Sequence, residues 1–194
     1  MLFNHKDEIT RQLKNIATQD NGGVKIEDAD KFRGDVLDQL VQNAVLNPSA
    51  EIKGLSRFLI KSAALELGIV NSSIQGLYEA RGRGEVKGFT VPALNIRGMP
   101  YELCRAIFRT AIKSNAGAFI FELAKSEMSY TFQKPHELST VILAAAIKEG
   151  FTGSVFIQGD HFQVNAKNYA QDPEKEIAGL KNLIQNGIAG GFYN

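Results

Sequence analysis

Cysteine is nearly absent from this chain of 194 residues, which contains only Cys104. A single cysteine cannot form a disulfide within the chain, so disulfides do not hold this fold together. Cys104 falls in an apolar helical pattern, where we expect a small buried residue rather than a reactive thiol. This cysteine usage fits a reducing compartment, and we expect a cytoplasmic protein.

Long apolar runs and an excess of one charge are also missing. No run approaches the roughly 18 residues of a membrane-spanning helix, and residues 1–8 lack the basic head and apolar core of a signal peptide. With 22 basic and 21 acidic residues the formal net charge is only +1, so the composition offers little attraction for a polyanion. We therefore expect neither a membrane nor a nucleic acid as a partner.

The first 70 residues carry apolar residues at helical spacing, and we predict an all-helical N-terminal segment. A polar break falls at residues 19–23. Further helices are expected from about residue 28 to 46 and, with Ser49 as its N-cap and Gly68 at its end, after residue 49. No pattern in this segment proposes chemistry.

After Gly88 the pattern changes to alternating strands and helices, following a short helix at 74–79 and a loop at 81–88. We predict strands at 89–95 and 118–123, and a third that ends at Asp160. The predicted helices are 100–113, 135–149 and about 173–186, with a polar loop at 124–134 and a fourth strand starting at Phe192-Tyr193. This alternation indicates a parallel sheet with helical crossovers. A (β/α)8 barrel and a doubly wound sheet both fit, but no G-x-G-x-x-G follows a strand, so the usual dinucleotide cradle is missing.

The third strand ends on a carboxylate and an imidazole side by side, Asp160 and His161. Functional groups of parallel sheets collect at the carboxyl ends of the strands. Because neighbouring strand residues point to opposite faces, these two can share a site only if the chain turns there, and we expect Gly159 to permit the turn. Taken alone, the dipeptide equally fits a strand end capped by two polar residues.

Three features resemble one family, the class II, metal-dependent ketose-bisphosphate aldolases. Val91-Pro92-Ala93-Leu94-Asn95 resembles the V-P-A-F-N strand that opens their barrel, and Gly159-Asp160-His161 resembles the Asp-His at the end of their third strand. The short helix at 74–79 stands where those enzymes place a helix across the barrel floor. The resemblance implies that residues 71–194 are the amino-terminal part of a (β/α)8 TIM barrel, with three βα units and the start of a fourth, preceded by a helical extension at 1–70.

The resemblance also implies an activity and a set of site residues. Such enzymes are carbon–carbon lyases of carbohydrate metabolism that reversibly cleave a ketose bisphosphate to dihydroxyacetone phosphate and an aldehyde, using Zn²⁺ or another divalent cation. His161 would be a metal ligand, Asp160 would exchange a proton with the aldehyde oxygen, and Asn95 would contact the substrate. Ser126 is a candidate for a further substrate contact, although the family's Gln-x-Ser-x-Gly is replaced here by residues 122–127.

The ligand count limits this interpretation. A catalytic zinc site takes three protein ligands, and the chain has only His5, His136 and His161, the first two expected at the surface. Gln158 and Gln163 are candidates for orienting the His161 ring. The family draws its other histidines and its glutamate base from later strands, so we expect the amino-terminal piece of a longer homo-oligomeric enzyme, inactive alone.

Two alternatives stay open. One is a non-catalytic helical and half-barrel module that scaffolds or oligomerises. The other is a barrel enzyme acting on another sugar phosphate, such as tagatose bisphosphate.

Overall fold

The computed structural model describes residues 1–20 and 22–194, and it divides the chain into two compact units. The first contains Met1–Val70, Met99–Ala116 and Thr140–Ser154, and the second contains Asn71–Gly98, Gly117–Ser139 and Val155–Asn194. The chain thus passes from one unit to the other several times. Residues 1–70 share their unit with two later segments of the chain.

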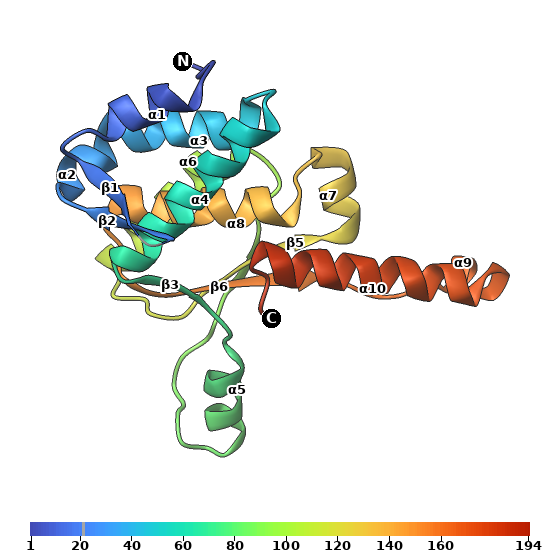
Figure 1. The fold of residues 1–194 in the computed structure, drawn as a ribbon. Helices are drawn as coiled ribbons and strands as arrows, with labels where there is room; N and C mark the ends of the chain where they lie inside the picture. The colour runs from blue at the N-terminus through green and yellow to red at the C-terminus, as the bar shows by residue number, and fades with distance from the viewer. Residues whose placement is uncertain (21) are drawn as a thin grey trace. The chain divides into compact units, whose positions relative to one another are not determined.

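Helices and one β-hairpin build the first unit (Figure 1). The helical elements are α1 (Lys6–Leu13), α2 (Ala29–Lys31), the π-helical turn η1 (Phe32–Val36), α3 (Leu37–Leu46), α4 (Ala50–Glu66), α6 (Pro100–Lys113) and the part of α8 (Pro135–Glu149) from Thr140 onward. The predicted limits of α4 are confirmed. The hydroxyl of Ser49 accepts a hydrogen bond from the backbone N–H of Ile52, and Gly68 takes a φ of +75° just after the helix, as a glycine cap does.

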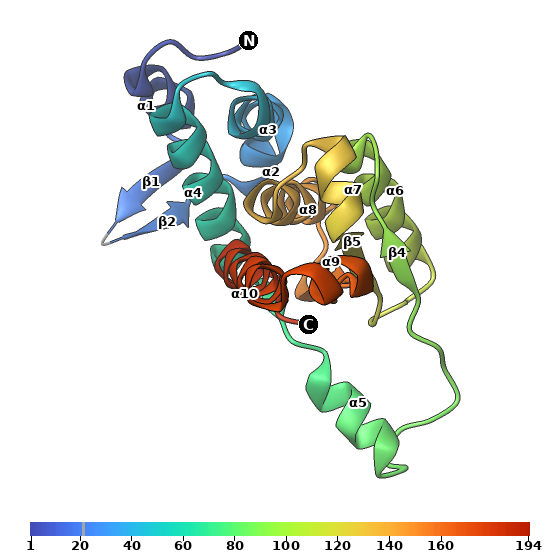
Figure 2. The same cartoon turned by 90° about the vertical axis from the view of Figure 1, so that its right-hand side faces the viewer.

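The prediction that residues 1–70 are helical throughout is wrong at an antiparallel hairpin. Its strands are β1 (Ala17–Asp20) and β2 (Gly23–Ile26), and they lie beside α4 in both views (Figure 2). Gly22 takes a φ of +87° at the turn, a conformation that glycine adopts at little cost. The break predicted at 19–23 is this turn; residue 21 lies outside the described residues. Each strand has four residues, too few for their alternation to stand out.

Polar side chains join α3 to α6 and α8 within the first unit. The hydroxyl of Tyr101 donates to Oδ1 of Asp38 at 2.8 Å. Nζ of Lys148 donates to Oδ2 of Asp38 at 2.7 Å and to the backbone oxygen of Gly34 at 3.1 Å. One carboxylate on the N-terminal segment therefore binds two helices from the later part of the chain.

The buried face of α6 holds Cys104, Phe108 and Ala111. Cys104 is buried, as predicted. Burial raises the pKa of its thiol. The aromatic ring of Phe108 packs against that of Phe151, with the ring centroids 4.9 Å apart. Apolar residues next to this stripe stay outside the core, among them Leu103 and Ile112, which are exposed.

A four-stranded sheet lies mostly in the second unit. Its strands are β3 (Ile69–Ser72), β4 (Ala93–Asn95), β5 (Ile120–Ala124) and β6 (Gly153–Asp160), in the order β3-β6-β5-β4. The β4–β5 and β5–β6 pairs are parallel, and their registers set Asn95 beside Glu122 and Glu122 beside Gln158. The predicted mixed α/β class with a parallel sheet is confirmed. The strands of residues 1–20 and 22–194 do not close into a barrel.

The helices of the second unit are α5 (Gln75–Gly82), α7 (Lys125–Thr131), α9 (Ala166–Gln171) and α10 (Pro173–Gly190). Helix α5 has no buried residue and stands away from β5 and β6 in Figure 1, so it does not cover an end of the sheet. Residues 125–131 were predicted as loop, which is wrong because they form α7. The last helix continues past Gly187 and is capped at Gly191, whose φ is +102°.

The end of the described chain runs along β6. The backbone N–H of Tyr193 donates to the oxygen of Ile157 at 3.1 Å, and that of Gly159 donates to the oxygen of Asn194 at 3.2 Å. Alternate residues of a strand direct their backbone groups to opposite edges, so residues 193–194 lie on the side of β6 away from β5. No helix in the described part of the chain is both long and apolar enough to cross a bilayer.

Candidate functional site

Asn95 and Asp160, two of the residues selected from the sequence, meet at the carboxyl ends of β4 and β6. Nδ2 of Asn95 donates to Oδ2 of Asp160 at 3.0 Å and to Oε2 of Glu127 at 3.0 Å. Parallel strands bring their carboxyl ends to one edge of the sheet, which is where functional groups of α/β folds collect. Residues far apart in the chain are thereby brought into one polar cluster.

Glu127 is the most enclosed member of this cluster, with only 6% of its surface exposed. Its carboxylate also accepts hydrogen bonds from the backbone N–H of Ala124, at 2.9 Å, and from Nε of Arg97. Burial by itself would raise the pKa of Glu127, but the hydrogen bonds from Ala124, Arg97 and Asn95 outweigh it and lower that pKa. Glu127 is therefore ionised at neutral pH.

His161 follows Asp160 at a turn in the chain. The turn is made by His161 itself, which takes a φ of +50°, whereas β6 continues through Gly159 to Asp160. The prediction of a turn was right, but its assignment to Gly159 was wrong. Nε2 of His161 lies 3.6 Å from Oδ1 of Asp160, and 72% of the imidazole side chain is exposed.

Gly159 is needed for close packing. A Cβ atom at this position would lie 2.6 Å from the ring of Phe162, so only glycine allows the ring to rest on the strand. The ring of Phe162 also stacks on that of Phe192, with centroids 6.5 Å apart. This packing fixes the chain directly after His161.

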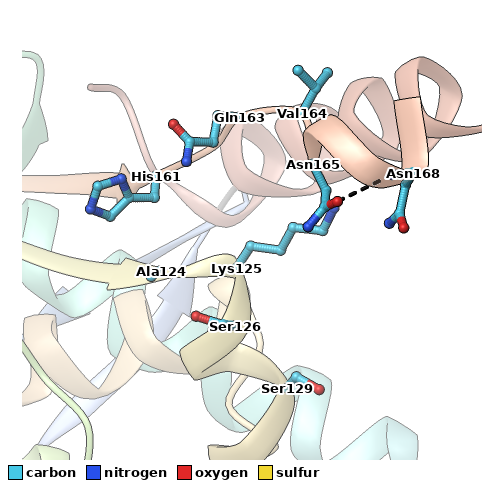
Figure 3. A pocket seen from close by; sticks show the side chains of 9 residues that line it. All are labelled: Ala124, Lys125, Ser126, Ser129, His161, Gln163, Val164, Asn165 and Asn168. Atoms are coloured by element: carbon cyan, nitrogen blue, oxygen red, sulfur yellow. Dashed lines mark hydrogen bonds between the residues drawn. The ribbon is translucent and has the colours of Figure 1, made fainter. Parts of the chain in front are cut away.

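A pocket of about 620 Å³ adjoins the polar cluster (Figure 3). Ser126 and His161, the other two residues selected from the sequence, both line it. The lining residues are Ala124, Lys125, Ser126, Ser129, His161, Gln163, Val164, Asn165 and Asn168. Serine hydroxyls of α7 lie on one side, and the segment from His161 to α9 forms the other. The wall is thus rich in hydrogen-bond donors.

Glu176 on α10 supports this wall from behind. Its carboxylate accepts hydrogen bonds from the backbone N–H of Asn165 at 2.8 Å and from Nδ2 of Asn168 at 3.3 Å, and lies 3.7 Å from Nζ of Lys125. The hydrogen bond from Asn165 is the main cause of the lowered pKa of Glu176. The residues that line the pocket are therefore held in place by a buried charge.

The two glutamines expected near His161 separate in the structure. Gln163 lines the pocket. Gln158 instead donates from Nε2 to the carboxylate of Glu122, because the strand register sets these two residues side by side. The prediction that Gln158 orients the imidazole is wrong.

The residues at this site do not make a zinc site by themselves. Within residues 1–20 and 22–194, no three His, Cys, Asp or Glu side chains are grouped closely enough to hold a metal ion. Among the described residues, Asp160 is the one other candidate ligand beside His161, whereas a catalytic zinc site takes three protein ligands. His136 is an exposed residue in the first turn of α8, and His5 precedes α1.

Glu127 and Arg97 were missed by the sequence analysis. A capping box places a glutamate three residues after a Ser or Thr N-cap. Ala124-Lys125-Ser126-Glu127 has the glutamate, which accepts the backbone N–H of Ala124, but lacks the N-cap hydroxyl. No known protein-family model, curated protein or solved structure matches this chain. The family resemblance therefore rests on the residues that carry it.

Proposed function

We propose that the carboxyl ends of β4, β5 and β6 form part of the active site of a class II ketose-bisphosphate aldolase. The observation that carries this proposal is the 3.0 Å hydrogen bond between Asn95 and Asp160. Asn95 ends one of the two sequence motifs that resemble the family and Asp160 lies within the other, and no local pattern requires them to meet. Their contact is what a shared site would need.

The order of β4, β5 and β6 supports a (β/α)8 arrangement, whereas the place of β3 in the sheet does not. β4, β5 and β6 lie side by side in chain order, and residues 193–194 add to the far side of β6. Barrel strands follow one another in chain order, whereas a doubly wound sheet reverses its order at a switch point. We infer that β4, β5 and β6 are the first three barrel strands. β3 precedes β4 in the chain yet lies beside β6, so the order of the described sheet reverses there, as it would in a doubly wound sheet.

The geometry at Asp160 suits proton transfer. One carboxylate oxygen is held by Asn95, while the other is 3.6 Å from the imidazole and 24% of the side chain is exposed. A fixed carboxylate with one accessible oxygen can exchange a proton with an aldehyde oxygen of the substrate. We assign that role to Asp160.

The adjoining pocket suits a sugar phosphate. Lys125 supplies a positive charge, and Ser126, Ser129 and Asn168 supply hydrogen-bond donors on the pocket wall. A ketose bisphosphate presents phosphate and hydroxyl oxygens, which such donors bind. We assign Ser126 and Asn95 to substrate binding.

His161 is the one residue of this chain to which the proposal assigns a role in binding a divalent cation. The family resemblance makes this imidazole a ligand of Zn²⁺ or another divalent cation. Within residues 1–20 and 22–194 no further pair of ligands is grouped with it, so each step proposed here is assigned to a side chain of this chain.

The test compares two variants of the protein as its gene encodes it, supplied with Zn²⁺ and fructose 1,6-bisphosphate. Asp160→Ala should lower triose phosphate formation strongly and keep the metal content, because its role is proton transfer. His161→Ala should lose metal and activity together. If Asp160→Ala lost the metal and His161→Ala kept it, the two roles would be reversed. A wild-type protein with no aldol cleavage of any ketose bisphosphate would favour a non-catalytic module, and selective cleavage of tagatose bisphosphate would keep the reaction and change the substrate.

A further inference from the structure

We propose that Glu127 is a positioning residue that determines which end of the Asn95 amide faces the substrate. This inference deepens the proposed function and rests on it for the identity of the ligand. It assigns to Asn95 a hydrogen-bond acceptor role, so that Asn95 recognises a substrate hydroxyl group.

The first step concerns the two hydrogens of the Asn95 amide. The side-chain NH₂ of asparagine has two donors, and its oxygen is an acceptor only. In the structure Nδ2 lies 3.0 Å from an oxygen of Glu127 and 3.0 Å from an oxygen of Asp160. Both hydrogens are thereby engaged, and Oδ1 is the group left for a ligand.

The second step concerns the reverse orientation of the amide. Turning Asn95 over would place Oδ1 against carboxylate oxygens of Glu127 and Asp160, an arrangement of acceptors without a donor. Such a mismatch between partly buried acceptors is costly. Asp160 disfavours the reverse orientation through one contact, and Glu127 on the other side adds a second contact of the same kind.

The third step concerns the rigidity of Glu127. Its carboxylate receives donors from three places: Nδ2 of Asn95 at the end of β4, Nε of Arg97 beyond β4, and the backbone N–H of Ala124 at the end of β5. A buried charge with this many partners has one stable position. Because contacts with the ends of β4 and β5 hold Glu127 in place, its carboxylate holds the Asn95 amide in one orientation.

The competing interpretation is that Glu127 only caps α7. Capping needs the bond to Ala124 and leaves the Asn95 amide unaffected by the state of Glu127. Glu127→Gln separates the two interpretations, because glutamine has one oxygen for the three donors and brings an NH₂ of its own. Glu174→Gln is the matched control, since Glu174 is an exposed residue in the first turn of α10.

The experiment follows the side-chain NH₂ signals of Asn95 by NMR in ¹⁵N-labelled protein, assigned through their loss in Asn95→Ala. We expect both signals to shift in Glu127→Gln and to stay in place in Glu174→Gln. In the wild type they should also shift as the Glu127 carboxyl is protonated at acid pH. If the Asn95 NH₂ chemical shifts change neither on the Glu127→Gln substitution nor on protonation of Glu127, the proposal is overturned. If Glu127→Gln does not fold, the same titration in Asp160→Asn decides, because that variant removes the other carboxylate that accepts a hydrogen bond from Nδ2 of Asn95.

A kinetic measurement connects this orientation to recognition. For an active enzyme we expect Glu127→Gln to lower kcat/KM about tenfold, the effect of one lost hydrogen bond. Relative to the wild type, it should also reduce the preference for the substrate over deoxy analogues that lack one hydroxyl. An equal loss for the substrate and every analogue would indicate capping only and overturn the acceptor role. A wild type without aldol cleavage would remove the proposed function, while the NMR result would still decide the orientation of Asn95.

Discussion

The close contact between Gly159 and Phe162 makes a quantitative prediction about the strand that carries Asp160. A Cβ atom at Gly159 would lie 2.6 Å from two ring atoms of Phe162 and 2.7 Å from a third. Ordinary contacts to a Cβ atom are 3.4–4 Å, so the ring would have to retreat by about 1 Å. Its retreat is opposed by the ring of Phe192, which stacks on it with the centroids 6.5 Å apart.

We expect Gly159→Ala to lower the free energy of unfolding by about 2 kcal/mol, the usual effect of overpacking by one methyl group. The backbone of Gly159 is not in the left-handed region, so steric contact with Phe162 is the source of this loss. For a chain of this size about 2 kcal/mol corresponds to a fall of roughly 4–8 °C in Tm. Urea unfolding followed by circular dichroism measures it.

A double-mutant cycle tests the cause. Phe162→Ala removes the ring, so Gly159→Ala should cost little in that background, and the two losses should couple by about 1.5 kcal/mol or more. Additivity of the two losses within about 0.5 kcal/mol would show that the ring is not what requires glycine. Gly179→Ala is the control, because a Cβ atom on this residue of α10 meets no atom within 4 Å.

Three further predictions concern other contacts. Asp38→Ala should lower the free energy of unfolding by about 2 kcal/mol, because it removes the acceptor of both Tyr101 and Lys148; an unchanged urea midpoint would contradict this. The pKa of Glu127 is lowered from its ordinary 4.5, so its stabilisation should be fully present above about pH 4.5 and lost as the pH falls through the lower folded value. The free energy of unfolding, measured from pH 7 to 3, should therefore differ less between wild type and Glu127→Gln as the pH falls. A difference that stays constant would refute the assignment of a stabilising charge to Glu127. The 194-residue chain should bind Zn²⁺ weakly in equilibrium dialysis, since a full site needs three ligands, and tight binding that survives His161→Ala would place the metal elsewhere.

The sequence was most informative at positions where a single residue marks the end of a helix or strand. Pro100 and Pro135 begin α6 and α8 as predicted, and Gly150 follows α8. Proline fits the first turn of a helix and glycine the residue after its last turn. The same local logic placed Asn95 and Asp160 at strand ends, and parallel pairing then brought them together.

Features that depend on distant partners could not be predicted in this way. Helix α7 begins with Glu127 accepting the N–H of Ala124, but Asn95 and Arg97 complete that arrangement from another strand. Likewise, no periodicity in residues 1–70 indicates that Asp38 binds Tyr101 and Lys148. Hydrogen-bond partners so far apart in the chain leave no local pattern.

The proposed role of Asp160 can be tested most directly by its effect on turnover. In the protein as its gene encodes it, supplied with Zn²⁺, triose phosphate formation from fructose 1,6-bisphosphate should fall about 10²- to 10⁴-fold in Asp160→Ala, the usual contribution of a general acid–base group. The control Glu174→Ala, on the exposed face of α10, should keep the wild-type rate. A folded Asp160→Ala protein that turns over at the wild-type rate would contradict the assignment of this strand end as the catalytic site.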